Sequence, residues 1–511
     1  MKQARTIMIQ GTASDVGKSV LTTALCRIFK QDGWKVAPYK SQNMALNSYV
    51  TVDGKEIGRA QGVQAEACGI IATTDMNPIL IKPTREMSAQ IVVHGEPHEE
   101  MSARRYREAY LPLAAEIVKD ALNRLRAEYE LVVMEGAGSP AEINLKSRDI
   151  VNMRVAGWAD SPVLLVADID KGGVFAAIVG TLELLEEHER KRVQGFIINK
   201  FRGDVSLLQP GLDWLEQRTG IPVLGVIPYV AQIGIEAEDS VVLDHLQSDE
   251  VIQNGLDIAV IRFPRISNFT DFDPVAAEPD VSLRYVQSLK QLKQPDVVIL
   301  PGSKNTLEDL AYLQQSGLAE AIQKLVSNGC RLVGICGGYQ MLGRSLSDPF
   351  QVESEQGAVS GLDFLPLSTL FYKEKRTVRV LGQVIGDAGA WSSWQGIPVD
   401  GYEIHMGQTI KLEPVHSLFS LGEGIDGAIS ENGQVWGTYI HGIFHNDEFR
   451  RRWLDSVRSF KGLDPILSII PFRTRQAEAF DKLADHVRNH LNMDKLYEIM
   501  GISELERVEG R

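Results

Sequence analysis

The sequence is poor in cysteine, and its cysteines form no recognisable framework. Only four occur in 511 residues, and no two are arranged as a Cys-x-x-Cys pair. Cysteine-based zinc sites and small disulfide-linked folds both need cysteines at close, regular spacing. We therefore expect reduced thiols and a cytoplasmic protein, because the cytosol keeps cysteines reduced.

Blocks of positive charge and long apolar runs are missing as well. The net charge is -14 and the sequence pI is about 5.3, which disfavours a general nucleic-acid surface. No apolar stretch reaches the ~20 residues of a membrane-spanning helix, and the chain start has too short an apolar run for a signal peptide. We expect small-molecule substrates and neither a nucleic-acid nor a membrane partner. A homo-oligomer is compatible with the sequence.

The chain does have a regular alternation of short apolar runs and helical stretches, which predicts an α/β fold. It is too long for one core, and an acidic stretch at 236–255 interrupts the alternation. We expect two domains, each a mostly parallel sheet flanked by helices, at residues 1–235 and 256–455. Residues 236–255 would be a linker, and 456–511 a helical extension of the second domain. The expected strands are Thr6–Gln10, Lys35–Tyr39, Leu131–Met134, Val163–Asp168, Val193–Asn199 and Ile221–Ile227, then Leu256–Phe263, Asp296–Leu300, Arg331–Ile335, Ala428–Ile429 and Val435–Ile440.

The residues from Gly11 to Ser19 have the pattern of a phosphate-binding loop. An apolar strand precedes them and a helix-compatible run follows, so the helix amino terminus would face bound phosphates. Lys18 would reach the terminal phosphates, and the Ser19 hydroxyl would ligate Mg²⁺. The strict Gly-x4-Gly-Lys-Ser pattern fails by one residue, because five residues separate the two glycines. The predicted nucleotide-binding residues are Gly11, Thr12, Asp15, Val16, Gly17, Lys18 and Ser19, with a polar pair after a later strand, Asn199 and Lys200.

Two acidic residues are candidates to complete the metal site. Glu135 ends an apolar strand, at the edge where ligands gather in parallel sheets, and Asp53 follows an amide-rich loop. Mg²⁺ needs oxygen ligands besides Ser19 and the phosphates. Structural roles stay open for both, because loop aspartates are common and acids are also favoured at helix amino termini.

Amide-rich segments after the strands are candidate substrate contacts. Gln42, Asn43 and Asn47 lie in one such segment, which suits either a polar ligand or a helix-capping loop. Arg148 lies in another, where cations and amides could hold a substrate carboxylate or form a solvated helix face. The sequence leaves both pairs of alternatives open.

A second chemical site centres on Cys336. A Gly-x-Cys-x-Gly pattern after an apolar strand is the thiol form of a nucleophile elbow. A nucleophilic thiol needs a base, and His441 lies just beyond another strand, with His405 as its rival. The expected oxyanion-hole donors are backbone N–H groups at Gly302 and Gly337.

Taken together, these segments resemble the cobyric acid synthase family, the glutamine-dependent amidotransferases of cobalamin biosynthesis, over essentially the whole chain. The first half also resembles dethiobiotin synthetase, whose P-loop has the same spacing, and the second half resembles class I glutamine amidotransferases. The segments that carry the resemblance are Gly11–Ser19, Gln42–Ser48, Ala167–Phe175, Asn199–Asp204 and Gly334–Gln340.

The resemblance implies Cys336 as the nucleophile and His441 as the base of glutamine hydrolysis. It implies a second substrate, adenosylcobyrinic acid a,c-diamide, whose b, d, e and g carboxylates are amidated through acyl phosphates. Ordinary class I enzymes have an acid two residues after the histidine, but this chain has Ile443, so the group that orients His441 stays open. The ligands of ATP and Mg²⁺ that the resemblance implies are Lys18, Ser19, Asp53 and Glu135.

Two other functions compete with this one. The nearer is the corrinoid amidase that makes the a,c-diamide, whose motifs differ around Gln42–Ser48. The other is a P-loop ATPase of the chromosome-partitioning or septum-positioning type with an inert second domain. Such ATPases carry an extra lysine near the start of the P-loop, where this chain has Ala13, and they need no elbow cysteine.

Overall fold

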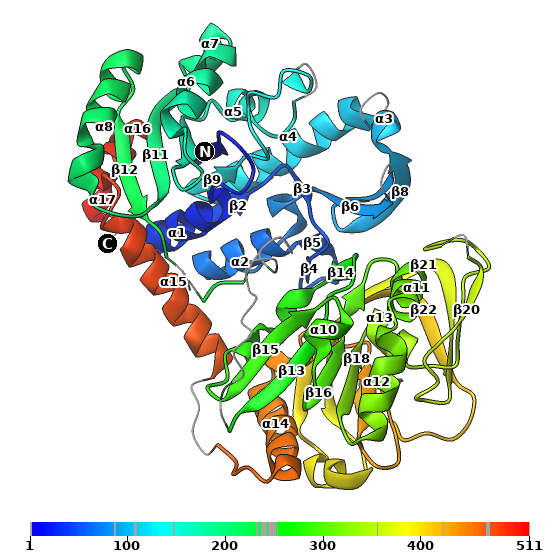
Figure 1. Ribbon diagram of the computed structural model, residues 1–511. Helices are drawn as coiled ribbons and strands as arrows, with labels where there is room; N and C mark the ends of the chain where they lie inside the picture. Colours follow the sequence, from blue (N-terminus) through cyan, green and yellow to red (C-terminus); the bar gives the residue numbers. More distant parts are fainter. Residues whose placement is uncertain are drawn as a thin grey trace. The chain divides into compact units, whose positions relative to one another are not determined.

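The computed structural model divides into two compact units (Figure 1). It describes residues 3–85, 88–106, 110–146, 149–230, 234–236, 243, 252, 254–354, 356–422, 424–466 and 471–509. The first unit comprises Met1–Ala45, Glu56–Glu238 and Arg475–Arg511, and the second comprises Leu46–Lys55 and Asp239–Thr474. Each unit therefore contains a segment that is distant in sequence from the rest of it.

The first unit is built on a parallel sheet of six strands in the order β12-β11-β10-β1-β9-β2. Strand β1 lies between β9 and β10, so the chain changes direction across the sheet at this strand, where ligands bind in such folds. The strands are buried on both faces, which explains their nearly continuous apolar sequences. They confirm the six expected strands: β1 (Arg5–Gly11), β2 (Val36–Tyr39), β9 (Leu131–Glu135), β10 (Val163–Asp168), β11 (Val193–Phe201) and β12 (Val223–Pro228).

Amphipathic helices flank this sheet. In the first of them, Leu21, Leu25 and Ile28 recur at helical spacing and are buried. The helices are α1 (Lys18–Gln31), α2 (Arg59–Cys68), α4 (Leu111–Glu128), α5 (Met153–Ala159), α6 (Val174–Leu184), α7 (Glu187–Arg190) and α8 (Val205–Thr219). A smaller sheet contains β3 (Gln42–Met44), β6 (Ile79–Arg85), β7 (Ser88–Val93) and β8 (Glu96–Ser102), beside the short η1 (Thr74–Met76) and α3 (Ala103–Arg105).

The C-terminal helices correct the expected domain boundaries. They are α15 (Phe472–Arg488), α16 (Met493–Ile499) and α17 (Glu504–Glu509). From Arg475 onward the tail belongs to the first unit, so the assignment of 456–511 to the second domain is wrong for this part. The physical reason is the apolar stripe of α15, in which Phe480, Leu483 and Val487 join the hydrophobic core that contains α1.

The expected linker, 236–255, lies mostly outside the described residues. Glu236 is described, and its carboxylate forms a buried ion pair with Arg59 of α2 at 2.5 Å. Within the described part of the chain, no helix combines the length and the apolarity needed to cross a membrane.

The second unit has a six-stranded sheet in the order β15-β13-β16-β18-β26-β25, parallel except for β25. Five of its strands were expected, and β15 was not. The strands are β13 (Leu256–Ile261), β15 (Val281–Val286), β16 (Val297–Leu300), β18 (Arg331–Ile335), β25 (Ala428–Ile429) and β26 (Val435–Thr438). The helices are α9 (Asp273–Ala276), α10 (Leu289–Leu292), α11 (Thr306–Gln315), α12 (Leu318–Ser327), α13 (Gly337–Met341) and α14 (Asp447–Lys461).

A second, largely antiparallel sheet in this unit was not expected from the sequence. Its centre is the long hairpin of β21 (Leu367–Val384) and β22 (Pro398–Lys411). Around it lie β19 (Ser345–Ser347), β20 (Ala358–Ser360), β23 (Phe419–Leu421) and β24 (Gly424–Asp426). Shorter elements are β4 (Ser48–Val50), β5 (Glu56–Gly58), β14 (Ile266–Ser267), β17 (Gly302–Ser303), η5 (Phe269–Phe272), η6 (Gly389–Trp394) and η7 (Ile443–His445).

Candidate functional site

The phosphate-binding loop lies between β1 and α1 and needs an unusual backbone. Asp15 has φ 58° and Gly17 has φ 98°, both in the left-handed region. A Cβ atom at Gly17 would also come within 2.2 Å of Asn199 Nδ2, so this position requires glycine. The turn leads directly into the amino terminus of α1, the end of a helix that favours phosphate.

Lys18 folds back over this loop. Its Nζ donates to the carbonyl oxygens of Ala13 at 2.9 Å and Gly138 at 3.1 Å. A Cβ at Gly11 would lie 2.9 Å from Nζ, so the displaced first glycine gives the lysine its room. The ammonium group is thus held at the loop, where it can meet a phosphate without a large movement.

Glu135 is the centre of a buried hydrogen-bond cluster at the start of α1. Its Oε1 accepts from the Ser19 hydroxyl at 2.7 Å and from Lys40 Nζ at 2.9 Å. Its Oε2 accepts from Gln64 Nε2 at 2.7 Å. Lys40 and Gln64 were not singled out from the sequence, although Lys40 opens the polar run after the second expected strand.

The hydroxyl of Ser19 and the carboxylate of Glu135 are oxygen donors that suit Mg²⁺, and they lie beside the phosphate loop. Among the described residues, no group of three or more His, Cys, Asp or Glu side chains could hold a metal alone. A Mg²⁺ site here would therefore draw on phosphate oxygens and water. Asp53 belongs to the second unit, where it is exposed in the turn between β4 and β5 and accepts the Thr51 hydroxyl.

Asn199 and Lys200 contact the phosphate loop through its carbonyl groups. Asn199 Nδ2 donates to the Val16 carbonyl at 2.8 Å, and Lys200 Nζ donates to the Asp15 carbonyl at 2.5 Å. Lys200 also forms an ion pair with Asp168 at 2.9 Å. Asn199 and Lys200 therefore stabilise the conformation of the phosphate loop.

Three of the four predicted substrate contacts fall on described residues. In the first unit, Gln42 accepts the Tyr106 hydroxyl, and Asn43 Nδ2 donates to Gln61 Oε1 at 3.0 Å. Asn47 is buried in the segment of the second unit that follows β3. Arg148 lies outside the described residues.

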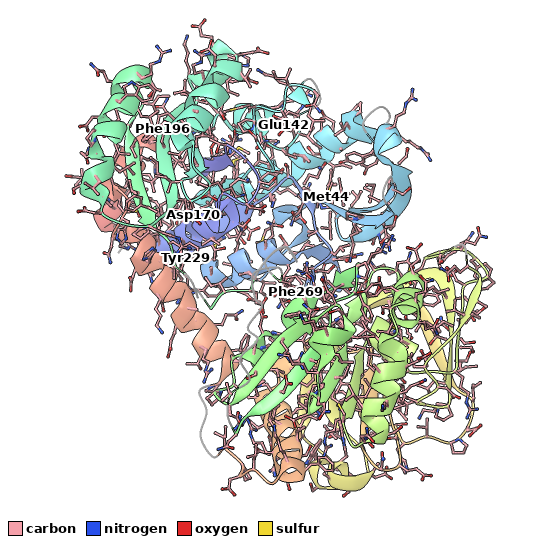
Figure 2. All side chains as sticks on the ribbon, in the orientation of Figure 1. Met44, Glu142, Asp170, Phe196, Tyr229 and Phe269 are labelled. Atoms are coloured by element: carbon pink, nitrogen blue, oxygen red, sulfur yellow. The ribbon has the colours of Figure 1, made fainter. Side chains whose placement is uncertain are left out.

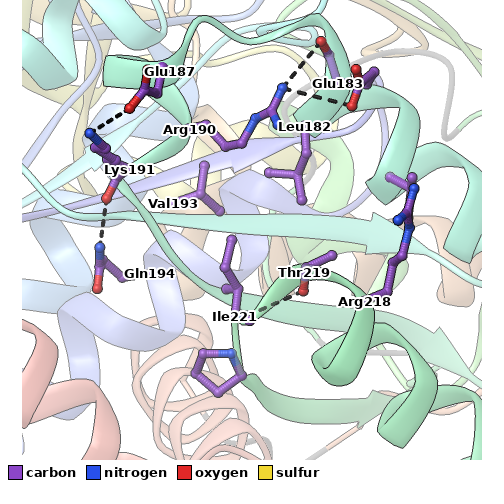
Figure 3. A pocket seen from close by; sticks show the side chains of 13 residues that line it. Leu182, Glu183, Glu187, Arg190, Lys191, Val193, Gln194, Arg218, Thr219 and Ile221 are labelled. Atoms are coloured by element: carbon purple, nitrogen blue, oxygen red, sulfur yellow. Dashed lines mark hydrogen bonds and ion pairs between the residues drawn. The ribbon is translucent and has the colours of Figure 1, made fainter.

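The first unit has a pocket of about 540 Å³ (Figure 3). Val193 and Pro222, which line it, lie at the amino ends of β11 and β12. The P-loop follows the carboxyl end of the parallel strand β1, so the pocket is at the opposite edge of the sheet. Its rim is tied by exposed ion pairs, Glu187 with Lys191 and Glu183 with Arg190.

Cys336 lies in the turn between β18 and α13 with a strained backbone. Its φ of 49° is uncommon for a residue with a side chain. A Cβ at Gly334 would lie 2.6 Å from the Gly338 carbonyl oxygen, and one at Gly338 would lie 1.9 Å from that of Leu300. Both flanking glycines are thus required by close backbone packing, as the elbow pattern predicts.

His441 is hydrogen-bonded to Asp271 and interacts electrostatically with Cys336, and all three side chains are buried. Its Nδ1 lies 2.6 Å from Asp271 Oδ2, and Asp271 Oδ1 accepts the Gly442 N–H at 3.0 Å. Burial favours the neutral imidazole, but the negative charges of Asp271 and Cys336 outweigh it and raise the pKa of His441 to about 10. The arrangement places the imidazole between the Cys336 side chain and a carboxylate that orients it.

Asp271 supplies the carboxylate that is missing at position 443, where this chain has Ile443. It lies 170 positions before His441, in η5, beyond the carboxyl end of β13. Its sequence signal is that of a polar residue after a strand, the position at which site residues gather in parallel sheets. His405 does not take the part of the base: its Nδ1 lies 2.7 Å from the Gly407 carbonyl oxygen, and its ring stacks on Tyr439 at 3.8 Å.

The two predicted oxyanion glycines lie at this thiol site. A Cβ at Gly302 would be 3.0 Å from His441 Cε1, and one at Gly337 would be 3.0 Å from the Ser303 backbone nitrogen. Gly302 and Ser303 form β17, which pairs with β14. The backbone of β17 therefore lies beside both the imidazole and the residue after the thiol.

Fold and site define a class: a P-loop nucleotide-binding unit and a unit with a Cys-His-Asp centre of the amidotransferase type, in one chain. Comparison with known families agrees. Residues 7–241 match the CobQ/CobB/MinD/ParA nucleotide binding domain, and residues 257–449 match the CobB/CobQ-like glutamine amidotransferase domain.

Comparison with curated relatives identifies the particular family. The chain is 53% identical to "Cobyric acid synthase" of Geobacillus sp. (strain WCH70) over 98% of both chains. It is 53% identical to the protein of that name from Desulforamulus reducens, over 99% of both chains. A third, from Anoxybacillus flavithermus, is 54% identical over 96% of both. The chain belongs to the cobyric acid synthase family, and it is an enzyme with an ATP-binding domain and a glutamine amidotransferase domain.

Proposed function

We propose that this enzyme uses glutamine and ATP to amidate the b, d, e and g carboxylates of adenosylcobyrinic acid a,c-diamide, giving adenosylcobyric acid. The observation that carries the proposal is the buried Cys336–His441–Asp271 centre in a chain that also holds an ordered phosphate loop. Membership of the cobyric acid synthase family supports the corrinoid as the second substrate.

Glutamine hydrolysis starts with the Cys336 thiolate, which attacks the carboxamide carbon of glutamine. Backbone N–H groups at Gly302 and Gly337 would stabilise the oxyanion, and the His441 imidazolium gives its proton to the departing ammonia. Water then attacks the thioester with neutral His441 as general base, which releases glutamate, leaves the proton of water on the imidazole and restores the thiolate. Asp271 keeps the imidazole in the tautomer that both steps need.

Amide formation uses the other site. A corrinoid carboxylate attacks the γ-phosphorus of ATP, ADP leaves, and ammonia then displaces phosphate from the acyl phosphate to form the amide. Lys18 offsets the charge that spreads over the transferring phosphoryl group. Ser19 and Glu135, with Asp53 as the predicted third ligand, would hold Mg²⁺, which supplies further charge neutralisation when bound. Gln42, Asn43, Asn47 and Arg148 stay as the predicted corrinoid contacts.

The competing functions are less well supported. A partitioning-type ATPase with an inert second domain has no use for a strained cysteine linked to a buried His–Asp pair. The a,c-diamide synthase would act on the same kind of substrate, but three curated relatives at 53–54% identity carry the name "Cobyric acid synthase". We also propose that the enzyme works in the cytoplasm, since all four of its cysteines are free thiols.

The decisive experiment is a count of amides. Purified enzyme is incubated with adenosylcobyrinic acid a,c-diamide, ATP, Mg²⁺ and glutamine, and the corrinoid is followed by mass spectrometry. We expect four successive losses of about 1 Da, one for each hydroxyl replaced by an amino group. The control substrate is cobyrinic acid, in which the a and c positions are free. Amidation of that substrate that stops after two steps would favour the a,c-diamide synthase.

A further inference from the structure

Residues 46–55 belong to the second unit, although the strands before and after them in the sequence belong to the first. Val50 of β4 forms an apolar cluster with Tyr402 and Ile404 of β22. The Val50 carbonyl accepts a hydrogen bond from Arg379 Nε of β21 at 2.8 Å. The segment is thus an integral part of the unit that holds Cys336.

The peptide groups of Ser48 reach two side chains that pack on His441. The Ser48 N–H donates to Asn268 Oδ1 at 2.8 Å, and its carbonyl accepts the Tyr402 hydroxyl at 3.4 Å. The Tyr402 ring stacks on the imidazole, with centroids 5.2 Å apart and planes at 18°. Asn268 Nδ2 lies 3.4 Å from His441 Nε2. Ser48 therefore hydrogen-bonds both to the side chain that stacks on the imidazole ring and to the side chain that lies at its Nε2.

Asn268 is buried and has a left-handed backbone, with φ 51° and ψ 39°. Asparagine is one of the few residues other than glycine that adopt this conformation routinely. It immediately precedes η5, whose first residue, Phe269, is labelled in Figure 2, and this short helix carries Asp271. The same turn thus contacts both nitrogens of His441: Asp271 contacts Nδ1, and Asn268 contacts Nε2.

We propose that Asn268 is a positioning residue for His441, and that Ser48 fixes it there, so that a segment from the first half of the chain completes the glutamine-hydrolysing centre. The inference rests on the glutaminase function proposed above. When Nδ1 donates its proton to Asp271, a neutral imidazole accepts at Nε2, and the Asn268 amide can donate to it. Asn268 then stabilises the neutral ring that must act as general base for thioester hydrolysis.

The effect of Asn268 on pH dependence has a definite sign. The titratable groups that face His441 are Asp271 from η5, Cys336 after β18 and Tyr402 from β22. A hydrogen bond to the neutral form of a base lowers its pKa, so loss of the amide raises the pKa of His441. The acid limb of the kcat profile for glutamine hydrolysis should therefore move to higher pH.

The test compares three variants of the full-length enzyme. Asn268→Gly keeps a residue that tolerates the left-handed backbone but removes the amide. Asn268→Asp keeps an acceptor for the Ser48 N–H but loses the donor to His441. Asn254→Gly is the matched control, because Asn254 is an exposed asparagine of the same unit with φ 60°. Steady-state glutamine hydrolysis is measured across pH in the presence of ATP and corrinoid, together with the thermal midpoint.

We expect both Asn268 variants to lose about tenfold or more in kcat, with KM within about twofold of the wild type and the acid limb shifted upward in Asn268→Gly. A kcat of Asn268→Gly equal to that of Asn254→Gly would overturn the inference, because the amide would then have no effect on catalysis. Full activity of Asn268→Asp would also overturn it, because the contact with Ser48 would then matter for folding and the donor to His441 would not matter. If Asn268→Gly does not fold, Asn268→Asp decides the question alone. A wild-type enzyme that does not hydrolyse glutamine would instead overturn the proposed function.

Discussion

Asp271 accepts a hydrogen bond from His441 Nδ1 at 2.6 Å, across 170 positions of sequence. Both side chains are buried, so the charge of the carboxylate acts on the imidazole with little screening by water. Asp271 orients the imidazole of His441. In ordinary class I enzymes an acid two residues after the histidine has this role, and this chain has Ile443 there. The effects of Asp271 on catalysis and on pH dependence can be measured separately.

Replacement of Asp271 by Asn should reduce glutamine hydrolysis by about 10²-fold to 10⁴-fold, because the amide favours the wrong tautomer of His441. Amidation driven by added ammonium chloride should stay near the wild-type rate. The control is Asp387→Asn, which alters an aspartate–histidine contact of the same 2.6 Å length, with His416, on the exposed surface. Equal losses in the two variants, or a parallel loss of ammonia-dependent synthesis, would show that Asp271 does not act on the thiol site.

The raised pKa of His441 predicts a pH-dependent contribution to stability. The pKa is raised from 6.5 to about 10, so the stabilisation is fully present below pH 6.5 and is lost as pH rises through about 10. The difference in free energy of unfolding between wild type and Asp271→Asn should therefore shrink as pH rises from 6.5 toward 10. Urea unfolding at several pH values measures it. A difference that grows with pH would mean that the imidazole is neutral in the folded enzyme.

Cys336→Ala should abolish glutamine-dependent amidation and leave ammonia-dependent amidation intact, because the synthetase chemistry needs ammonia and no thiol. Cys330→Ala is the matched control: this thiol is also buried, and burial raises its pKa to about 12, which keeps it unreactive. A glutamine-analogue alkylating agent should label Cys336 alone, as read by peptide mass spectrometry. Loss of both activities in Cys336→Ala would contradict the assignment of two separate sites.

The parallel sheets were predictable because their strands are nearly continuous apolar runs. Val163–Asp168 and Arg331–Ile335, for example, begin and end where expected, since both faces of each strand are buried. The sheet around the β21–β22 hairpin was missed because only part of each strand is buried. In β21, exposed Lys373, Glu374 and Arg379 interrupt the apolar pattern on which the prediction relied.

The sites were predictable where chemistry depends on consecutive residues, as in Gly11–Ser19 and around Cys336. Asp271, Asn268 and Lys40 escaped because their roles depend on which strand ends meet in space. The short η5 has no periodic pattern, and its only sequence signal is a polar cluster after a strand. The discontinuous units were not predicted for the same reason, because β4 and α15 pack on cores that are distant from them in sequence.

Lys18→Met should lower ATP-dependent amidation by about 10²-fold or more with either nitrogen source, because the charge on the transferring phosphoryl group is no longer offset. Glutamine hydrolysis assayed without ATP should be unchanged. Lys191→Met is the control, since Lys191 is 73% exposed and lies in the same unit, on the rim of the pocket in Figure 3. If both variants lose activity equally, the pocket is part of the synthetase site and the assignment to the P-loop edge fails.

The C-terminal tail gives a prediction about stability. Leu483 of α15 is 4% exposed within the hydrophobic core of the first unit, whereas Leu505 of α17 is 76% exposed. Leu483→Ala should therefore destabilise the first unit by about 2–5 kcal/mol, and Leu505→Ala should change little. Hydrogen–deuterium exchange locates the effect. Peptides from α1 should lose protection in Leu483→Ala while peptides from β18 keep theirs; the reverse pattern would place the tail with the second domain.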